Sequence, residues 1–312
     1  MPVLSGASGV KIAESLAPLL GMEHVPLESR RFPDGESYVR VPSSAIESVR
    51  SETVVLVSNT YPDAGIMQTV LLLGAIDDIR RGNLANLKGE GEQSLEDVGP
   101  GVILAIPYYG YARQDKRFSP GEAVSARVIA EVLAESCDGI TILDLHAPMV
   151  LDGMSLPIEF VSSMPEIAEK LQNDVAPDFI LSPDKGAISR ASEVASLIGC
   201  EFSYLEKTRI DAHTIEHTPK DLEVSGKVVT IVDDMISTGG TICRASDALR
   251  RQGATEVHAA CTHGLFTGGA LSRLANHVDG VHTTDSLPNP RANVSAAPAL
   301  SRGVARLIEQ LS

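Results

Sequence analysis

Short apolar runs alternate with segments of helical periodicity along most of this chain of 312 residues. The runs are of strand length and predominantly apolar without alternation, so they predict strands that are buried on both faces of a parallel sheet. The predicted strands are Thr53–Val57, Val102–Ile106, Ile140–Leu143, Asp178–Leu181, Val228–Val232 and Val257–Cys261, and the predicted helices are Ile66–Arg80, Val124–Ala134, Ser189–Ile198 and Thr241–Arg251. This order predicts an α/β fold with mainly parallel sheets flanked by helices, in which ligands gather at the carboxyl ends of the strands.

The distribution of polar residues predicts which helix faces and which loops are exposed. In the predicted helix 124–134 the apolar residues mark one face. They are Val124, Val128, Ile129, Val132 and Leu133. The stretch Lys88–Gly99 is rich in Gly and Glu with little to bury, which predicts an exposed loop. Matching the chain against itself shows no internal repeat, although two similar α/β halves would escape such a comparison.

Two carboxylates and a loop of small residues follow the strand Val228–Val232. The segment reads Asp233-Asp234-Met235-Ile236-Ser237-Thr238-Gly239-Gly240-Thr241 and opens a predicted helix. Backbone N–H groups at a helix start bind anions, and glycines let a phosphate approach them closely. The two acids would repel a phosphate but suit the hydroxyls of a sugar. The segment predicts a sugar-phosphate site and resembles the phosphoribosyl diphosphate loop of the phosphoribosyltransferase-like fold; the alternative is an ordinary strand-turn-helix connection.

Polar side chains also follow three other predicted strands. Tyr108–Phe118 combines tyrosines, arginines, a lysine and an amide, which suits a purine and its polyphosphate, or equally a solvated loop with tyrosines packed beneath it. His146 follows Ile140–Leu143, where a single histidine is more often structural than a ligand. Asp184, within Ser182-Pro183-Asp184-Lys185-Gly186, is as well suited to cap a helix as to contact a metal.

Two segments lie outside this series. Pro33-Asp34-Gly35 predicts a turn before Tyr38–Val41. Glu206–Arg209 leads into Asp211–Lys220, which has little apolar content and is expected to be mobile. Lys207 and Arg209 are either solvated cations or groups that close over a polyphosphate and neutralise charge in a transition state.

Composition narrows the setting. The length allows two domains, each with its own core. A formal net charge of −15 without a basic cluster argues against nucleic acid as a partner. The four cysteines stand singly, which favours buried residues over disulfides or zinc ligands. No apolar run is long enough to span a membrane and no signal peptide is apparent, so we expect a cytoplasmic protein that binds no membrane. The acidic balance suits a salt-adapted host or an ordinary acidic enzyme.

The order of these motifs resembles that of the ribose-phosphate pyrophosphokinase (phosphoribosyl diphosphate synthetase) family over nearly the whole chain. The motifs are Asp34-Gly35-Glu36, Tyr111-Ala112-Arg113-Gln114-Asp115-Lys116, Asp144-Leu145-His146-Ala147, Pro183-Asp184, Lys207 with Arg209, and Asp233-Asp234-Met235-Ile236 with Thr238-Gly239-Gly240-Thr241. The Arg-Gln-Asp and Asp-Asp-Met-Ile elements are the most specific. Phe118–Glu122 looks closer to archaeal members than to bacterial ones.

The resemblance implies two phosphoribosyltransferase-like domains. They are 1–146, on the ATP side, and 147–300, on the ribose 5-phosphate side, followed by a C-terminal helix at 301–312 that packs on the first domain. The implied reaction transfers the diphosphoryl group of ATP to the 1-hydroxyl of ribose 5-phosphate, giving 5-phosphoribosyl 1-diphosphate and AMP for nucleotide biosynthesis.

The resemblance also implies residue roles. Asp34, Gly35, Glu36, Arg113, Gln114 and Asp115 would bind ATP, the first three from a neighbouring subunit of a homo-oligomer. Arg209, Asp233, Asp234 and Ser237, Thr238, Gly239, Gly240 and Thr241 would bind ribose 5-phosphate. His146 and Asp184 would contact Mg²⁺, the cofactor, and Lys207 and Arg209 would be catalytic.

Three departures and two rival functions accompany this interpretation. Ser237 stands where many members have Asp, Lys185 stands where a small or apolar residue is common, and Lys88–Gly99 looks like an insertion. A phosphoribosyltransferase would share the loop 232–241 without needing Arg113-Gln114-Asp115 or the paired Lys207 and Arg209. A non-catalytic homologue would have lost catalytic cations or metal contacts, which this chain keeps.

Overall fold

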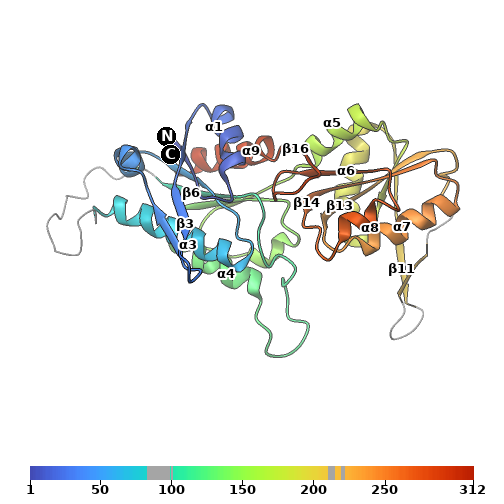
Figure 1. Cartoon of the computed structure of the whole chain (residues 1–312), viewed down its shortest axis with the longest axis horizontal. Helices are drawn as coiled ribbons and strands as arrows, with labels where there is room; N and C mark the ends of the chain where they lie inside the picture. Colours follow the sequence, from blue (N-terminus) through green and yellow to red (C-terminus); the bar gives the residue numbers. More distant parts are fainter. Residues whose placement is uncertain (83–98, 100, 210–214, 219–221) are drawn as a thin grey trace. The chain divides into compact units, whose positions relative to one another are not determined.

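The computed structural model describes residues 1–82, 99, 101–209, 215–218 and 222–312, and for 206–209 and 215–218 it describes the backbone. The chain forms two compact units, Met1–Val161 with Ala297–Ser312, and Ser162–Ala296. Figure 1 shows the elements of both units. No helix among the residues described is both long and apolar enough to cross a membrane.

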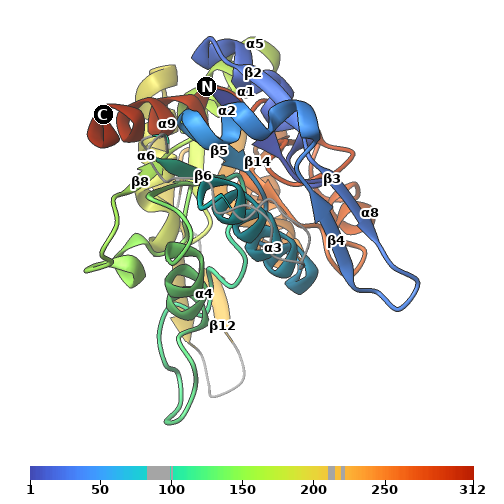
Figure 2. The ribbon, with the colours of Figure 1, turned by 90° about the vertical axis from the view of Figure 1, so that its left-hand side faces the viewer.

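The first unit is a parallel sheet of six strands in the order β2-β1-β5-β6-β7-β8. Its elements are β1 (Pro2–Ser5), α1 (Val10–Leu20), β2 (Glu23–Pro26), β3 (Glu28–Arg31), β4 (Ser37–Arg40), η1 (Ser43–Ala45), α2 (Ile46–Ser51), β5 (Val54–Val57), α3 (Asp63–Arg80), β6 (Val102–Ile106), α4 (Ser125–Ala134), β7 (Gly139–Leu143), η3 (Pro148–Leu151), β8 (Ile158–Val161) and α9 (Ala297–Leu311). Figures 1 and 2 show α1 and α9 on one face of the sheet and α3 and α4 on the other. This double cover explains why β5, β6 and β7 are buried at every position.

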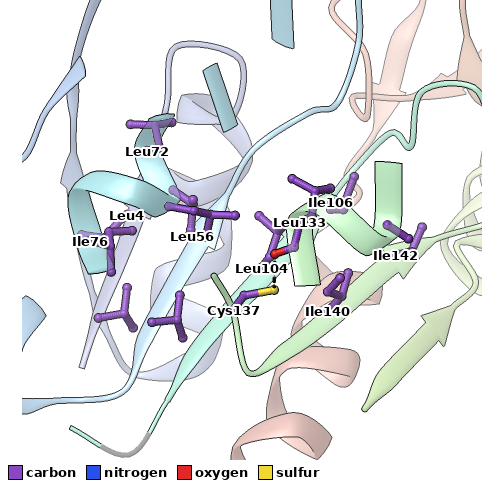
Figure 3. Packing of buried hydrophobic residues seen from close by; sticks show 14 of the residues in the cluster. Leu4, Leu56, Leu72, Ile76, Leu104, Ile106, Leu133, Cys137, Ile140 and Ile142 are labelled. Atoms are coloured by element: carbon purple, nitrogen blue, oxygen red, sulfur yellow. Dashed lines mark hydrogen bonds between the residues drawn. The ribbon is translucent and has the colours of Figure 1, made fainter. Parts of the chain in front are cut away.

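The core beneath α3 and α4 is built from aliphatic side chains of neighbouring strands (Figure 3). Leu56, Leu104 and Ile140 project from the sheet toward Leu72 and Leu133 of these helices, and all five are fully buried. The Cys137 thiol donates to the Leu133 carbonyl at 3.3 Å, and burial raises the pKa of this thiol to about 12. All four cysteines are free; Cys137, Cys243 and Cys261 are buried, as predicted, whereas Cys200 is half-buried.

The last helix completes the first unit. In α9, Gly303 lies against Thr141 and Val161 so closely that a Cβ there would collide with the Thr141 hydroxyl. Arg306 Nε donates to Glu159 Oε2 at 2.6 Å, which ties α9 to the edge strand β8. The first unit therefore extends through Val161 and takes back a helix that begins at Ala297, whereas the sequence analysis placed boundaries at residues 146 and 300.

The second unit repeats the topology of the first. Its elements are α5 (Met164–Asp174), β9 (Phe179–Ser182), η4 (Lys185–Ala187), α6 (Ile188–Ile198), β10 (Glu201–Tyr204), β11 (Glu206–Arg209), β12 (Ile215–Thr218), β13 (Val228–Ile236), α7 (Gly240–Arg251), β14 (Glu256–Gly264), α8 (Ala270–Leu274), β15 (Gly280–Thr284) and β16 (Ala292–Val294). The sheet order β10-β9-β13-β14-β15-β16 is again second-first-third-fourth-fifth-sixth along the chain, and every pairing is parallel.

Each unit also carries an antiparallel ribbon between the second and third strands of its sheet, β3 with β4 and β11 with β12. Figure 2 shows the β3–β4 ribbon running away from its sheet. The two similar halves that self-matching of the sequence did not detect are therefore present as a repeated fold.

Each strand and helix predicted from the pattern is present, and the α/β fold with two mainly parallel sheets is confirmed. The predicted face of α4 is wrong in part. Val128 and Val132 are 50% and 49% exposed, because the helix packs through Ala126, Ala130 and Leu133 instead. Of the predicted loop Lys88–Gly99, residues 88–98 lie outside the described residues. The stretch expected to be mobile contains β12, and its residues 211–214 and 219–220 also lie outside them.

Candidate active site

The acid pair lies within the carboxyl end of β13, in the middle of the second sheet. β13 continues past Val232 because β14 continues beside it, with Asp233 in register with Cys261. Burial raises the pKa of Asp233 well above its ordinary value, and the negative charges of Asp234 and Asp184 add to the rise. Three carboxylates thus act on one another here. A cation or the hydroxyl donors of a ligand would stabilise their ionised forms.

Arg190 of α6 supplies one positive charge to this group. Its Nη2 lies 3.7 Å from Asp234 Oδ2, and both side chains are largely buried. The sequence analysis missed Arg190. One signal in the sequence could have revealed it: a charged residue stands next to the apolar Ala191 near the start of the helix that follows the Asp184 turn.

The loop Ser237–Thr241 is shaped by its glycines. Gly239 has φ +75°, a left-handed conformation that favours glycine, and Gly240 is the first residue of α7. The first N–H groups of a helix have no acceptor within the helix, and those of α7 start in this turn. The turn thus presents donors and a positive helix end to an anion, as the sequence predicted for a phosphate.

A second loop holds this turn in place. The N–H of Thr267 donates to the Ser237 carbonyl at 3.0 Å, and the hydroxyls of the two residues lie 3.1 Å apart. Arg273 of α8 donates to the Thr238 carbonyl, and a Cβ on Gly239 would lie 3.1 Å from Leu274 Cγ. The cradle is therefore positioned before a ligand arrives.

The turn at the corresponding place in the first unit, Ser58–Gly65 after β5, is used differently. Asn59 Oδ1 accepts from the Tyr108 N–H at 2.7 Å, and Thr60 Oγ1 accepts from the Gly110 N–H at 2.8 Å. Its polar side chains support the loop after β6, which holds Arg113, Gln114 and Asp115.

Within that loop the tyrosines do not share one role. Tyr108 and Tyr109 are 4% and 1% exposed, and the Tyr109 hydroxyl donates to the Ala126 carbonyl at 2.6 Å, so both are packing residues. Burial raises the pKa of Tyr109. Tyr111 has φ +60°, is 45% exposed and donates to Asp63 Oδ1 at 2.7 Å. Of the three rings, that of Tyr111 is the one accessible for stacking.

The cationic part of the loop is folded around Glu122. Its Oε2 accepts from the Phe118 N–H at 2.7 Å and from the Ser119 N–H at 3.0 Å, which lowers the pKa of Glu122. Gln114 Nε2 donates to the Lys116 carbonyl at 3.2 Å. Arg113 is exposed, and Asp115 is half-buried. The loop holds its own backbone in shape and leaves the Arg113 guanidinium facing solvent.

The remaining predicted residues lie on separate elements. Asp34, Gly35 and Glu36 form the exposed turn of the β3–β4 ribbon, where the Glu36 N–H donates to Asp34 Oδ1 at 3.0 Å. The predicted Pro-Asp-Gly turn is therefore present. Lys207 and Arg209 lie in β11, in register with residues 217 and 215 of β12.

The two predicted metal contacts belong to different units. His146 is an exposed residue of the first unit that follows Asp144, whose φ is +40°. Asp184, in the second unit, accepts from the Gly186 N–H at 2.8 Å and so caps η4. Among the described residues no group of three or more His, Cys, Asp or Glu side chains is arranged to hold a metal ion.

Comparisons with known proteins find relatives for both units. A profile of the N-terminal domain of ribose phosphate pyrophosphokinase matches residues 1–84 and 100–136, and one of the phosphoribosyl transferase domain matches residues 160–288. Ribose-phosphate pyrophosphokinase of Methanopyrus kandleri is 38% identical over 98% of this chain and 99% of its own. That of Methanothermobacter thermautotrophicus is 36% identical over 96% and 98%. The crystal structure of phosphoribosylpyrophosphate synthetase from Mycobacterium smegmatis superposes with a TM-score of 0.79, at 26% identity over 99% of this chain and 98% of that one.

Proposed function

The chain belongs to the ribose-phosphate pyrophosphokinase family, and we propose that it performs the family's reaction with the residues located above. The enzyme transfers the diphosphoryl group of ATP to the 1-hydroxyl of ribose 5-phosphate, giving 5-phosphoribosyl 1-diphosphate and AMP for nucleotide biosynthesis. The hydroxyl oxygen attacks the β-phosphorus, the bond from this phosphorus to the oxygen bridging the α-phosphorus breaks, AMP leaves, and the hydroxyl proton passes to water.

The second unit is proposed to bind ribose 5-phosphate. The observation that carries this assignment is the junction of the half-buried Asp233 and the buried Asp234 with the turn Ser237–Thr241. Asp233 and Asp234 accept from the ribose hydroxyls, while the amides of the turn and the hydroxyls of Ser237, Thr238 and Thr241 bind the 5-phosphate. Because Arg273 and Thr267 already fix the turn, little conformational entropy is lost when the phosphate binds.

The first unit is proposed to bind ATP through Arg113, Gln114 and Asp115. The exposed guanidinium of Arg113 suits a polyphosphate, and the accessible ring of Tyr111 offers a surface for the base. Lys207 and Arg209 of the β11–β12 ribbon neutralise the charge that develops as the diphosphoryl group moves, which makes them the proposed catalytic residues.

The negative charges in the second unit favour a bound cation, which we propose is Mg²⁺. Three interacting carboxylates, one of them with a raised pKa, form an acid-rich group for which Arg190 provides one cation, and carboxylate oxygens are the ligands that Mg²⁺ prefers. His146 and Asp184 would hold the ion. When bound, Mg²⁺ neutralises the charge of the phosphate oxygens.

We infer a cytoplasmic homo-oligomer. Two observations support association: Asp34, Gly35 and Glu36 stand on the exposed tip of a ribbon, from which they can reach a site on another subunit, and α4 leaves Val128 and Val132 half exposed.

The test of function is product analysis. Purified protein with ATP, Mg²⁺ and ribose 5-phosphate is expected to form AMP in step with the loss of ribose 5-phosphate, without ADP. Formation of ADP, or AMP formation that does not depend on ribose 5-phosphate, would contradict the assignment. For the ATP site, Arg113→Leu is expected to raise the KM for ATP. Arg81→Leu is the matched control, because the exposed Arg81 pairs with Asp77 of α3 at 2.8 Å.

A further inference from the structure

Two histidines in the second unit lie at the end of the sheet where β14 and β15 begin. His258 of β14 stands opposite Gly280 of β15, and His282 lies two residues further along β15 on the same face. Their ring centroids are 5.8 Å apart with the rings tilted by 38°. α5 covers this face, because Ala260, which follows on β14, packs in the cluster that contains Met164, Ile167 and Leu171 of that helix.

Each ring uses one nitrogen on a neighbouring polar group and buries the other. His258 Nε2 lies 3.1 Å from Glu256 Oε2, and His282 Nδ1 lies 3.3 Å from the amide nitrogen Nδ2 of Asn293. His258 Nδ1 and His282 Nε2 are buried and have no hydrogen-bond partner among the residues that the structure describes. Since a buried polar atom without a partner is costly, two of them on adjacent strands need an explanation.

Both of these nitrogens face the space above Gly280. A Cβ at Gly280 would lie 2.5 Å from His258 Nδ1 and 3.2 Å from His282 Nε2. Because residue 280 is glycine, the two imidazoles pack over a backbone that places no side chain between them. Any side chain at this position would fill the point on which the two nitrogens converge.

We propose that His258 and His282 bind one divalent transition-metal ion of the Zn²⁺, Ni²⁺ and Cu²⁺ class above Gly280, with water completing its coordination. Imidazole nitrogen is a preferred ligand of these ions. A metal-bound histidine commonly donates its other N–H to a carboxylate or an amide oxygen, which is the relation of His258 to Glu256 and, with the Asn293 amide oxygen turned toward the ring, of His282 to Asn293.

The surroundings keep His282 in the form that binds a metal. Burial lowers the pKa of His282, and so does the neighbouring His258. Asp174 raises this pKa, while Lys170 and Arg291 lower it. Asp174 is already engaged by Lys170 at 2.8 Å. A lowered pKa favours the neutral imidazole, the form that has a lone pair on one nitrogen.

This site is separate from the sugar-phosphate site. Asp233 is in register with Cys261, three residues after His258, which corresponds to about 10 Å along the strand. Ala260 and Val232 face α5 and α6, whereas Ile231 and Ala259 belong to the core that contains Ile242 of α7. By alternation His258 lies on the first of these faces and Asp233 on the other. A metal between the histidines would join β14 to β15 and stabilise the unit without taking part in the reaction.

Metal binding is tested by titrating the chelator-treated full chain with Co²⁺, followed by visible absorption, and by thermal unfolding with and without Zn²⁺. Wild type is expected to bind one ion that is absent from His282→Asn and from Gly280→Ala. A hundredfold excess of Zn²⁺ over its Kd is expected to raise Tm by about 5 °C. Gly280→Ala keeps both histidines and fills the space between them, so it tests the site even where a histidine variant fails to fold.

The control is His277→Asn, which removes a surface histidine that pairs with Asp247 at 2.9 Å. It is expected to bind as wild type does, and AMP formation with Mg²⁺ is expected to persist in Gly280→Ala. Equal metal uptake by wild type and Gly280→Ala would overturn the proposal. If, in addition, Zn²⁺ did not change the Tm of wild type, the two nitrogens would be assigned to a bound water instead.

Discussion

Replacing Gly240 with alanine is expected to separate the stability of the fold from the binding of the sugar phosphate. An added Cβ would lie 3.5 Å from Arg244 Nη1 and 3.9 Å from Thr238 Oγ1, which are ordinary contact distances. Gly240 is also the first residue of α7, where alanine favours the helix. The free energy of unfolding is therefore expected to stay unchanged or to rise by up to about 1 kcal/mol.

The same methyl group would stand among the amides proposed to bind the 5-phosphate. Loss of one hydrogen bond to a charged group costs about 1.5–3 kcal/mol, which corresponds to a rise of roughly 10- to 150-fold in the Kd for ribose 5-phosphate. ATP affinity is expected to hold, because Arg113 and Gln114 lie on a loop of the other unit. A more stable protein that binds ribose 5-phosphate less tightly is the signature of a ligand site.

Calorimetric titration with each ligand and urea unfolding measure the two effects. The matched control is Gly74→Ala in α3, where an added Cβ has no atom within 4 Å. It is expected to gain stability in the same way and to bind both ligands as wild type does. If Gly240→Ala kept its Kd for ribose 5-phosphate within about threefold, the turn would not be the phosphate cradle. An equal loss of ATP affinity would show that it is not a dedicated site.

Four further predictions concern the cations, the metal, the acid pair and the last helix. Lys207→Ala is expected to lower kcat by roughly two to four powers of ten with little change in KM, while the surface variant Lys227→Ala keeps its kcat. His146→Ala is expected to raise the Mg²⁺ concentration for half-maximal activity at unchanged Tm; an unaltered titration would make His146 structural. Because the folded-state pKa of Asp233 is raised, ionisation of this carboxyl destabilises the fold as pH rises from about 4 through that pKa. Asp233→Asn is therefore expected to abolish activity and yet to unfold at a higher urea concentration than wild type at neutral pH. In acid, where Asp233 is protonated, the two proteins are expected to unfold at the same urea concentration. Gly303→Ala is expected to cost about 1–3 kcal/mol by urea unfolding, since its Cβ would overlap the Thr141 hydroxyl; an unchanged midpoint would mean that α9 shifts freely.

Local pattern was sufficient for the strands and helices because each is a periodic run with a clear boundary. It failed on α4, where valines lie on one side of the helix and alanines on the other. Periodicity shows where the most hydrophobic side chains lie on a helix. Ala126 and Ala130 are buried in place of Val128 and Val132 because their face of the helix meets the sheet. That choice is made by tertiary packing, which no single segment encodes.

The candidate site was predictable to the extent that it is contiguous in sequence. Asp233, Asp234 and the glycine turn form one segment, and the structure keeps them together at the end of β13. Arg190 escaped notice because its partner Asp234 is distant in the chain, and an arginine in a helix is ordinarily solvated. The assignment of Lys207 and Arg209 to catalysis stays a prediction.

The position of α9 has a consequence for how the polypeptide is made. The strands that α9 covers are complete at Val161, but the helix begins at Ala297, after the entire second unit. A domain usually folds as it emerges from the ribosome, the N-terminal one first. Here the face of the first unit around Thr141 and Val161 stays uncovered until α9 has been synthesised. The unit that begins first is the one that finishes last, and a nascent chain arrested before Ala297 contains a second unit that is whole and a first unit that is not.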